Sequence, residues 1–153
     1  MKLSRFGYYF LTLVILTAVS IYSCGQQSQP TVTNAEKDIF NSTTNDTVTI
    51  ENDSLEYEVI IIDPGFNTWL QSIARPRGFY SQQFLENRNI QFVNEWNRRV
   101  MMPQTYNSNL YEMQINYTSD IDYGYEVNYQ IYNYFIYFQR KYNQRLTGFI
   151  PRI

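Results

Sequence analysis

Hydrophobic and polar positions divide the chain into an apolar start, a polar stretch and a longer remainder with regular periods. Residues 6–22 are apolar apart from small or weakly polar side chains, and residues 25–56 are rich in Gln, Ser, Thr, Asn and Asp. Over residues 57–153, apolar positions recur with helical or strand-like periods, which is the primary sign of folded elements. The pattern therefore predicts one small globular domain over 57–153, preceded by two segments that lie outside it.

A buried strand and a short helix are predicted at the start of the domain. The β-rich run Tyr57–Ile62 ends at a turn sequence, Asp63-Pro64-Gly65. Apolar residues at helical spacing follow over residues 66–73, and Asn67 is placed to cap this helix. The helix should end at Arg75-Pro76, because a residue before proline avoids helical backbone angles.

A long helix and a second strand should follow. Ser81 is the expected N-cap of a helix that carries one apolar face and runs to Met102, just before Pro103. Residues 111–117 then alternate between apolar and polar side chains. That period of two predicts a half-buried strand.

The last segment fits two structures. As a helix with Asp122 as its cap, residues 123–145 carry one continuous apolar face. The alternation of side chains up to Ile131 also fits a hairpin over residues 111–131, which remains the alternative. With the helix, the order β-α-α-β-α predicts an α+β fold, in which a small sheet of two or three strands packs against two long helices and one short helix.

The apolar start has the layout of a secretory signal over residues 1–23. Lys2 and Arg5 precede the apolar run, which is short for a membrane span of ~20 residues. The run ends at Ile21-Tyr22-Ser23-Cys24-Gly25, which resembles the lipobox of bacterial lipoproteins. This resemblance implies that the signal peptide is removed and that Cys24 becomes an N-terminus carrying fatty acids such as palmitate, which anchor the protein to a membrane.

The polar stretch predicts a flexible, acidic tether over residues 24–56. Residues 25–56 carry six acidic side chains against Lys37 and few large apolar groups, too few to offset the entropy of the chain. Two triplets in it, Asp46-Thr47-Val48 and Asp53-Ser54-Leu55, resemble the acceptor pattern of O-glycosylation in Bacteroidota. That resemblance implies glycans at Thr47 and Ser54.

The composition narrows the chemistry that the chain can perform. The 153 residues include no His and one Cys, which excludes Ser-His-Asp and Cys-His nucleophile systems and zinc sites built from His and Cys. Twelve Lys and Arg against 14 Asp and Glu give a net charge of −2, without the excess of cations that nucleic acid requires. We expect no cofactor, no metal ion and no nucleic-acid partner.

Four segments of the domain also carry a resemblance, namely residues 60–66, 75–81, 95–97 and 132–135. They are similar to the corresponding segments of a family of short, uncharacterised lipoproteins of Bacteroidota, classed as a domain of unknown function. The resemblance covers residues 57–145. It implies a location in the cell envelope and supplies neither an activity nor a site residue.

Two groups of side chains are candidates for binding. Arg75 and Arg77 lie on a short loop, where two guanidinium groups can hold a carboxylate or a phosphate. Tyr125, Tyr129 and Tyr132 form an aromatic ridge on the last helix, of a kind that docks proteins and glycans. A structural interpretation stands beside each: helix capping and internal ion pairs for the arginines, and core packing for the tyrosines.

The expected function is that of a lipoprotein held by Cys24 in the outer membrane, on its periplasmic or surface face. Its domain would act as a non-catalytic binding or accessory factor for another envelope protein. The alternative is a small glycan-binding module or a hydrolase. A glycosidase needs two carboxylates that face each other, and Asp63, Glu86 and Glu95 are the candidates.

Overall fold

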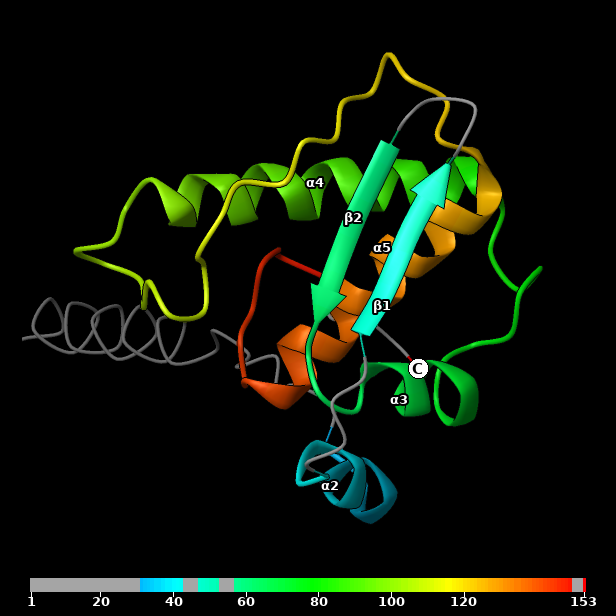
Figure 1. Cartoon of the computed structure of the whole chain (residues 1–153), viewed down its shortest axis with the longest axis vertical. Coiled ribbons are helices and arrows are strands. Elements are labelled where there is room, and N and C mark those ends of the chain that lie inside the picture. Colours follow the sequence, from blue (N-terminus) through cyan, green and yellow to red (C-terminus); the bar gives the residue numbers. More distant parts are fainter. Residues whose placement is uncertain (1–30, 43–46, 53–56, 150–152) are drawn as a thin grey trace, which may run out of the picture.

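The computed structural model describes residues 31–42, 47–52, 57–149 and 153. Along this part of the chain the elements are helix α2 (Asn34–Phe40), strands β1 (Thr47–Asn52) and β2 (Tyr57–Ile62), and helices α3 (Phe66–Ser72), α4 (Gln82–Val100) and α5 (Gly124–Lys141). The protein is a mixed helix and sheet structure, as predicted (Figure 1). The predicted order β-α-α-β-α is not observed, because the described elements follow the order α-β-β-α-α-α.

Helix α5 is the centre of the described domain. Twelve of its 18 residues are buried, and it contacts α4, α3 and β1. Figure 1 shows the sheet lying across α5. The helix predicted for this segment is confirmed, and the alternative hairpin over residues 111–131 is wrong. The N-cap position is Tyr123, and the expected cap, Asp122, instead accepts a hydrogen bond from the backbone amide of Gly124 at 2.9 Å.

The sheet consists of β1 and β2, paired antiparallel from Thr47 opposite Ile62 to Asn52 opposite Tyr57. Ile50 of β1 is fully buried in the core. In the described part of the chain β2 has one neighbouring strand, β1, so its other edge is free.

Residues 111–117 do not form a strand, so this prediction is wrong. Their backbone is bound by side chains of α4 in place of a neighbouring strand. The indole N–H of Trp96 donates to the carbonyl of Met113 at 2.9 Å. The amide of Asn97 bonds both backbone groups of Ile115, at 2.8 and 2.9 Å. The alternation of apolar and polar residues in the sequence therefore belongs to a segment that is bound to a helix and not to a strand.

The prediction of a flexible tether is wrong for residues 31–42 and 47–52, which fold onto the domain. Helix α2 is held by Glu36, whose carboxylate is fully buried and forms an ion pair with Arg140 of α5, with 2.6 Å between Oε2 and Nη2. The indole N–H of Trp69 donates to the same carboxylate at 3.2 Å. Average composition does not indicate such a contact, because one buried residue and a distant partner decide it.

Of the N-caps predicted for α4 and α3, the first is confirmed and the second is not. Ser81 caps α4 as predicted, since its hydroxyl accepts a hydrogen bond from the helix backbone. Helix α3 begins instead after Gly65, at a φ of 88°, and Asn67 lies inside the helix. A Cβ at Gly65 would lie 2.7 Å from the carbonyl oxygen of Ile39, so the close approach of α2 favours glycine at this position.

Several predictions fall on residues outside the described part of the chain. These are the signal peptide over residues 1–23, the acylation of Cys24 and the glycan at Ser54. Within the described residues, no helix combines the length and the hydrophobicity needed to cross a bilayer.

Replacing Glu36 by Gln should lower the free energy of unfolding by roughly 3–5 kcal/mol, because it leaves the Arg140 cation buried without its counter-ion. Glu126→Gln is the matched control, since Glu126 forms an exposed pair with Arg77. That change should cost about 1 kcal/mol or less. Urea unfolding followed by circular dichroism measures both values, and equal losses would contradict the importance of the buried pair.

Acid should reveal the same ion pair. Burial opposes ionisation of Glu36, but hydrogen bonds from Arg140, Thr33 and Trp69 outweigh it and lower the pKa of Glu36 from 4.5 to about 2. A lowered pKa adds stability that is complete above pH 4.5 and disappears as the pH falls towards 2. The difference in stability between the parent protein and Glu36→Gln should therefore narrow over this interval.

Candidate functional site

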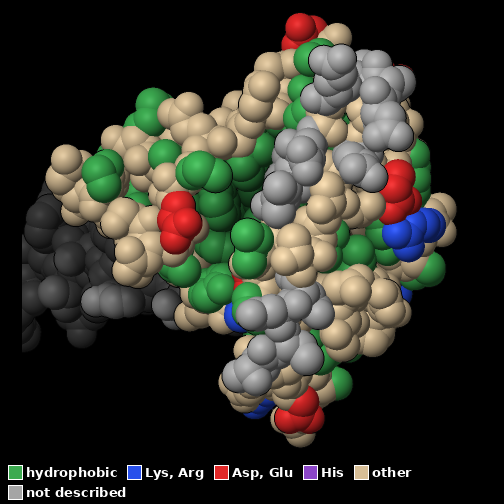
Figure 2. Space-filling model, in the orientation of Figure 1, with side chains coloured by type: hydrophobic (Ala, Val, Ile, Leu, Met, Phe, Trp, Pro, Cys, Tyr) green, Lys and Arg blue, Asp and Glu red, His purple; other side chains and the backbone are tan. Residues whose placement is uncertain are grey.

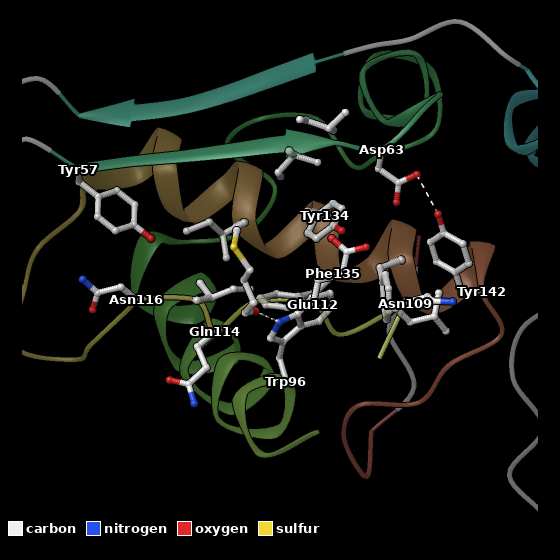
Figure 3. Close-up of a pocket in the computed structure, with 17 residues that line it drawn as sticks. Tyr57, Asp63, Trp96, Asn109, Glu112, Gln114, Asn116, Tyr134, Phe135 and Tyr142 are labelled. Carbon is white, nitrogen blue, oxygen red and sulfur yellow. Dashed lines mark hydrogen bonds between the residues drawn. The ribbon is translucent and has the colours of Figure 1, made fainter. Parts of the chain in front are cut away.

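A cleft of about 680 Å³ opens beside the free edge of β2. Figure 2 shows hydrophobic side chains gathered in a hollow next to the sheet. The cleft lies between β2, the loop residues 109–116 and helix α5, and Trp96 of α4 also lines it (Figure 3). We call it the β2 cleft.

The floor of the β2 cleft is apolar. Ile131, Phe135 and Phe138 lie at helical spacing on α5 and so share one face of that helix. The ring of Trp96 stands edge to face against Phe138, with 4.8 Å between ring centroids, and against Phe135 at 6.0 Å. Because these rings cover one another, the floor presents ring edges and aliphatic groups more than open aromatic planes.

Asp63 lies in the lining of the β2 cleft, directly after β2 (Figure 3). Its carboxylate accepts hydrogen bonds from the ammonium group of Lys141 at 2.6 Å and from the hydroxyl of Tyr142 at 3.1 Å. Burial, with the negative charge of Asp63, raises the pKa of Tyr142 to about 12. The tyrosine therefore stays protonated and donates, and Asp63 is held in an internal ion pair.

Glu112 supplies a second carboxylate from the extended segment. It is exposed and has no hydrogen bond or ion pair with the described residues. Burial raises the pKa of Tyr134, and the charges of Asp63 and Glu112 act in the same direction, which places this hydroxyl near both acids. No Lys or Arg lines the β2 cleft, so its charged lining groups are all negative.

Tyr57, at the start of β2, brings a buried hydroxyl to the cleft. Its ring packs against Tyr123 with 4.4 Å between centroids, and burial raises its pKa. The hydroxyl has no hydrogen-bond partner among the described residues, and Figure 3 shows it pointing inward. A buried polar group without a partner costs about 1–3 kcal/mol, so this hydroxyl lowers the stability of the fold.

These groups support binding more than catalysis. The chain has no His, the tyrosines of the β2 cleft hold their protons, and the carboxylate of Asp63 is already paired. Among the described residues, no cluster of three or more acidic, His or Cys side chains could hold a metal ion. The cleft can bury apolar groups and accept a cation at Glu112.

The predicted arginine loop and tyrosine ridge do meet, but they bind each other. The guanidinium group of Arg77 donates two hydrogen bonds to the carboxylate of Glu126, at 2.8 and 2.6 Å. It also lies over the ring of Tyr129, 4.6 Å from the ring centroid. The hydroxyl of Tyr129 donates to the carbonyl of Arg75 at 2.8 Å, and that of Tyr125 accepts from the loop backbone at 2.7 Å. The guanidinium group expected to hold a partner's anion thus has an internal carboxylate.

The two remaining members of the predicted surfaces have different surroundings. The guanidinium of Arg75 donates to the carbonyl of Ile153 at 2.8 Å and lies over the ring of Phe79. Tyr132 is buried and packs edge to face against Tyr80. Tyr132 is therefore a core residue, and binding by the exposed arginines stays a prediction.

The three acids considered for a hydrolase lie at different places. Asp63 lines the β2 cleft, and Glu86 lines a second hollow of about 420 Å³. Glu95 forms ion pairs with Arg98 and Arg99 along α4, at 2.8 and 2.7 Å. No two of these acids line either hollow, so the geometry does not support the facing carboxylates of a glycosidase.

The sequence analysis singled out Asp63 but not the other polar groups of the β2 cleft, Tyr57, Glu112 and Tyr134. Tyr57 and Glu112 belong to the two predicted strands, and Tyr134 belongs to the apolar face of the last helix. A period of two signals an extended backbone and does not indicate which partner that backbone finds. The cleft exists because residues 111–117 bind α4 and not β2.

A family model described as a family of unknown function, DUF6146, matches residues 9–151. The chain belongs to the DUF6146 family. No curated protein and no solved structure matches it. The DUF6146 match begins well before residue 57, so α2 and β1 lie within the sequence that defines the family and are not appendages to it.

In this DUF6146 protein, Tyr57→Phe should be neutral or raise the free energy of unfolding by about 1 kcal/mol, because it removes a buried hydroxyl without a partner. Tyr117→Phe is the matched control: the hydroxyl of Tyr117 donates to Asn128 at 2.7 Å. Its loss should cost about 1 kcal/mol. Urea unfolding measures both, and a comparable loss for Tyr57→Phe would mean that its hydroxyl is satisfied in the free protein.

Proposed function

We propose that this protein is an envelope lipoprotein whose domain is a non-catalytic accessory factor and binds a partner protein in the β2 cleft. The single observation that carries the binding function is the composition of the cleft. It joins an apolar floor to an exposed carboxylate, Glu112, that has no hydrogen bond or ion pair with the described residues. Such a cavity fits the default pattern of a ligand site.

The sequence is what supports the proposed lipid anchor. Cys24 is the one cysteine of the chain and stands at the end of the apolar run, where a lipobox would require it. The resemblance to Bacteroidota lipoproteins supports an outer-membrane location in that group of bacteria. The O-glycosylation triplets agree with the same origin, and Thr47, at the start of β1, is exposed.

A glycan is the weaker candidate for the occupant of the β2 cleft. Sugars stack on open aromatic planes, whereas Trp96 is almost fully buried and its ring stands edge to face against Phe138. A partner protein supplies the aliphatic side chains and backbone groups that the lining can accept.

The anchor predicts a specific loss. Cys24→Ser should abolish labelling of the protein by a palmitate analogue and should change the mass of the mature chain, because the acylated sulfur is gone. Metabolic labelling and mass spectrometry of the membrane fraction measure both. Identical labelling and mass in the parent and the variant would contradict the lipid anchor.

The binding function predicts a position-specific crosslink. A photo-reactive residue in place of Met113, which is 76% exposed on the lining of the β2 cleft, should capture one defined partner protein in intact cells. The matched control is Met101, which is 66% exposed at the end of α4 and does not line the cleft. Mass spectrometry identifies the adducts, and the same set of adducts from both positions would contradict a specific site.

A further inference from the structure

We infer that the β2 cleft takes an extended segment of the partner protein, which adds to the free edge of β2 as a third strand and carries Lys or Arg among apolar residues. This inference rests on the proposed binding function and specifies its ligand. The bound segment is thus defined by its extended backbone, by its apolar side chains and by its positive charge.

Strand β2 has one unpaired edge in the described part of the chain. A strand with one neighbour turns the N–H and C=O groups of alternate residues away from that neighbour, and such edges are templates for another strand. Natural proteins often cover a free edge. Here residues 109–116 lie across the cleft from β2, and they are held there by Trp96 and Asn97 of α4. The edge therefore opens into a cavity.

Apolar groups lie on the floor and on both walls of the β2 cleft. Every second side chain of an added strand would point to the floor, where Ile131, Phe135 and Phe138 lie. On the two walls, Ile62 and Met113 are 74% and 76% exposed. A strand between these walls would cover both side chains, which are among the most exposed large hydrophobic groups of the described residues.

The charge of the lining favours a basic segment. The lining contains two carboxylates and no cation. Lys141 already pairs with Asp63, whereas the exposed Glu112 has no ion pair with the described residues. A Lys or Arg of the bound segment would supply the counter-ion of Glu112.

A second copy of this chain is a poor occupant. Its own strands have the sequences Thr-Val-Thr-Ile-Glu-Asn and Tyr-Glu-Val-Ile-Ile-Ile, each with one acid and no base. Pairing either of them with β2 would bring negative charge into a negatively lined cleft. Like charges across an interface disfavour association.

The test uses the full chain in detergent and a fluorescent probe peptide of about eight residues, which at roughly 3.3 Å per residue spans β2. Valines in the probe alternate with threonines and lysines. N-methylation of alternate backbone amides, which removes the donors along one edge, should weaken binding at least about tenfold. Binding of the unmodified probe should slow hydrogen exchange in β2. Anisotropy and exchange mass spectrometry are the readouts.

Charge is tested on the protein. Glu112→Lys should weaken binding of the lysine probe by about tenfold and favour a probe with glutamates in place of lysines. Glu86→Lys, in the second hollow, introduces the same charge change outside the cleft and should leave affinity unchanged. Equal effects of the two variants would overturn the assignment of the cation to Glu112.

The outcomes separate this inference from the proposed function. If the N-methylated probe binds as tightly as its parent, or if no probe binds while Met113 still captures a partner in cells, strand addition is wrong and the binding function stands. Capture of a second copy by Met113, or binding of glycan fragments in place of peptides, also overturns the inference. If Met113 captures nothing, the binding function itself fails.

Discussion

Helix α5 must be covered on almost every side, and the rest of the described domain follows from this constraint. A helix that is apolar around most of its circumference is stable only inside a shell of other elements. Helix α4, the sheet and α3 provide most of that shell. Near the C-terminal end of α5, Arg140 would bring a bare cation into the interior, and Glu36 of α2 neutralises it. The polar N-terminal stretch is therefore part of the fold.

The same constraint accounts for the β2 cleft. A sheet of two strands is small, and β1 occupies one edge of β2. Residues 111–117 could have occupied the other edge, but Trp96 and Asn97 bind their backbone groups and hold them against α4. The space between β2 and residues 109–116 remains open above α5. The candidate site is thus the part of the shell around α5 that this chain leaves incomplete.

The sequence predicted those elements whose own residues carry a clear apolar period. Helices α4 and α5 and strand β2 were recognisable for that reason, and Ser81 was recognisable as a cap. Helix α2 and strand β1 were not, because their stability depends on Arg140 and on β2, distant partners that composition does not reveal. Among the candidate site residues, Arg77 and Tyr129 contact each other in the folded chain. Sequence could not show that they bind one another.

The folding of α2 onto the domain also limits where a partner can lie. With a tether through residue 56, an anchor at Cys24 would let the domain explore about 110 Å above the membrane. Because the chain is already held at Thr33, the cap of α2, only eight residues lie between it and Cys24, and the nine steps from Cα to Cα reach about 30 Å. Under the proposed anchor, the β2 cleft therefore meets proteins at the membrane surface, and a basic extended segment close to the bilayer is within its range.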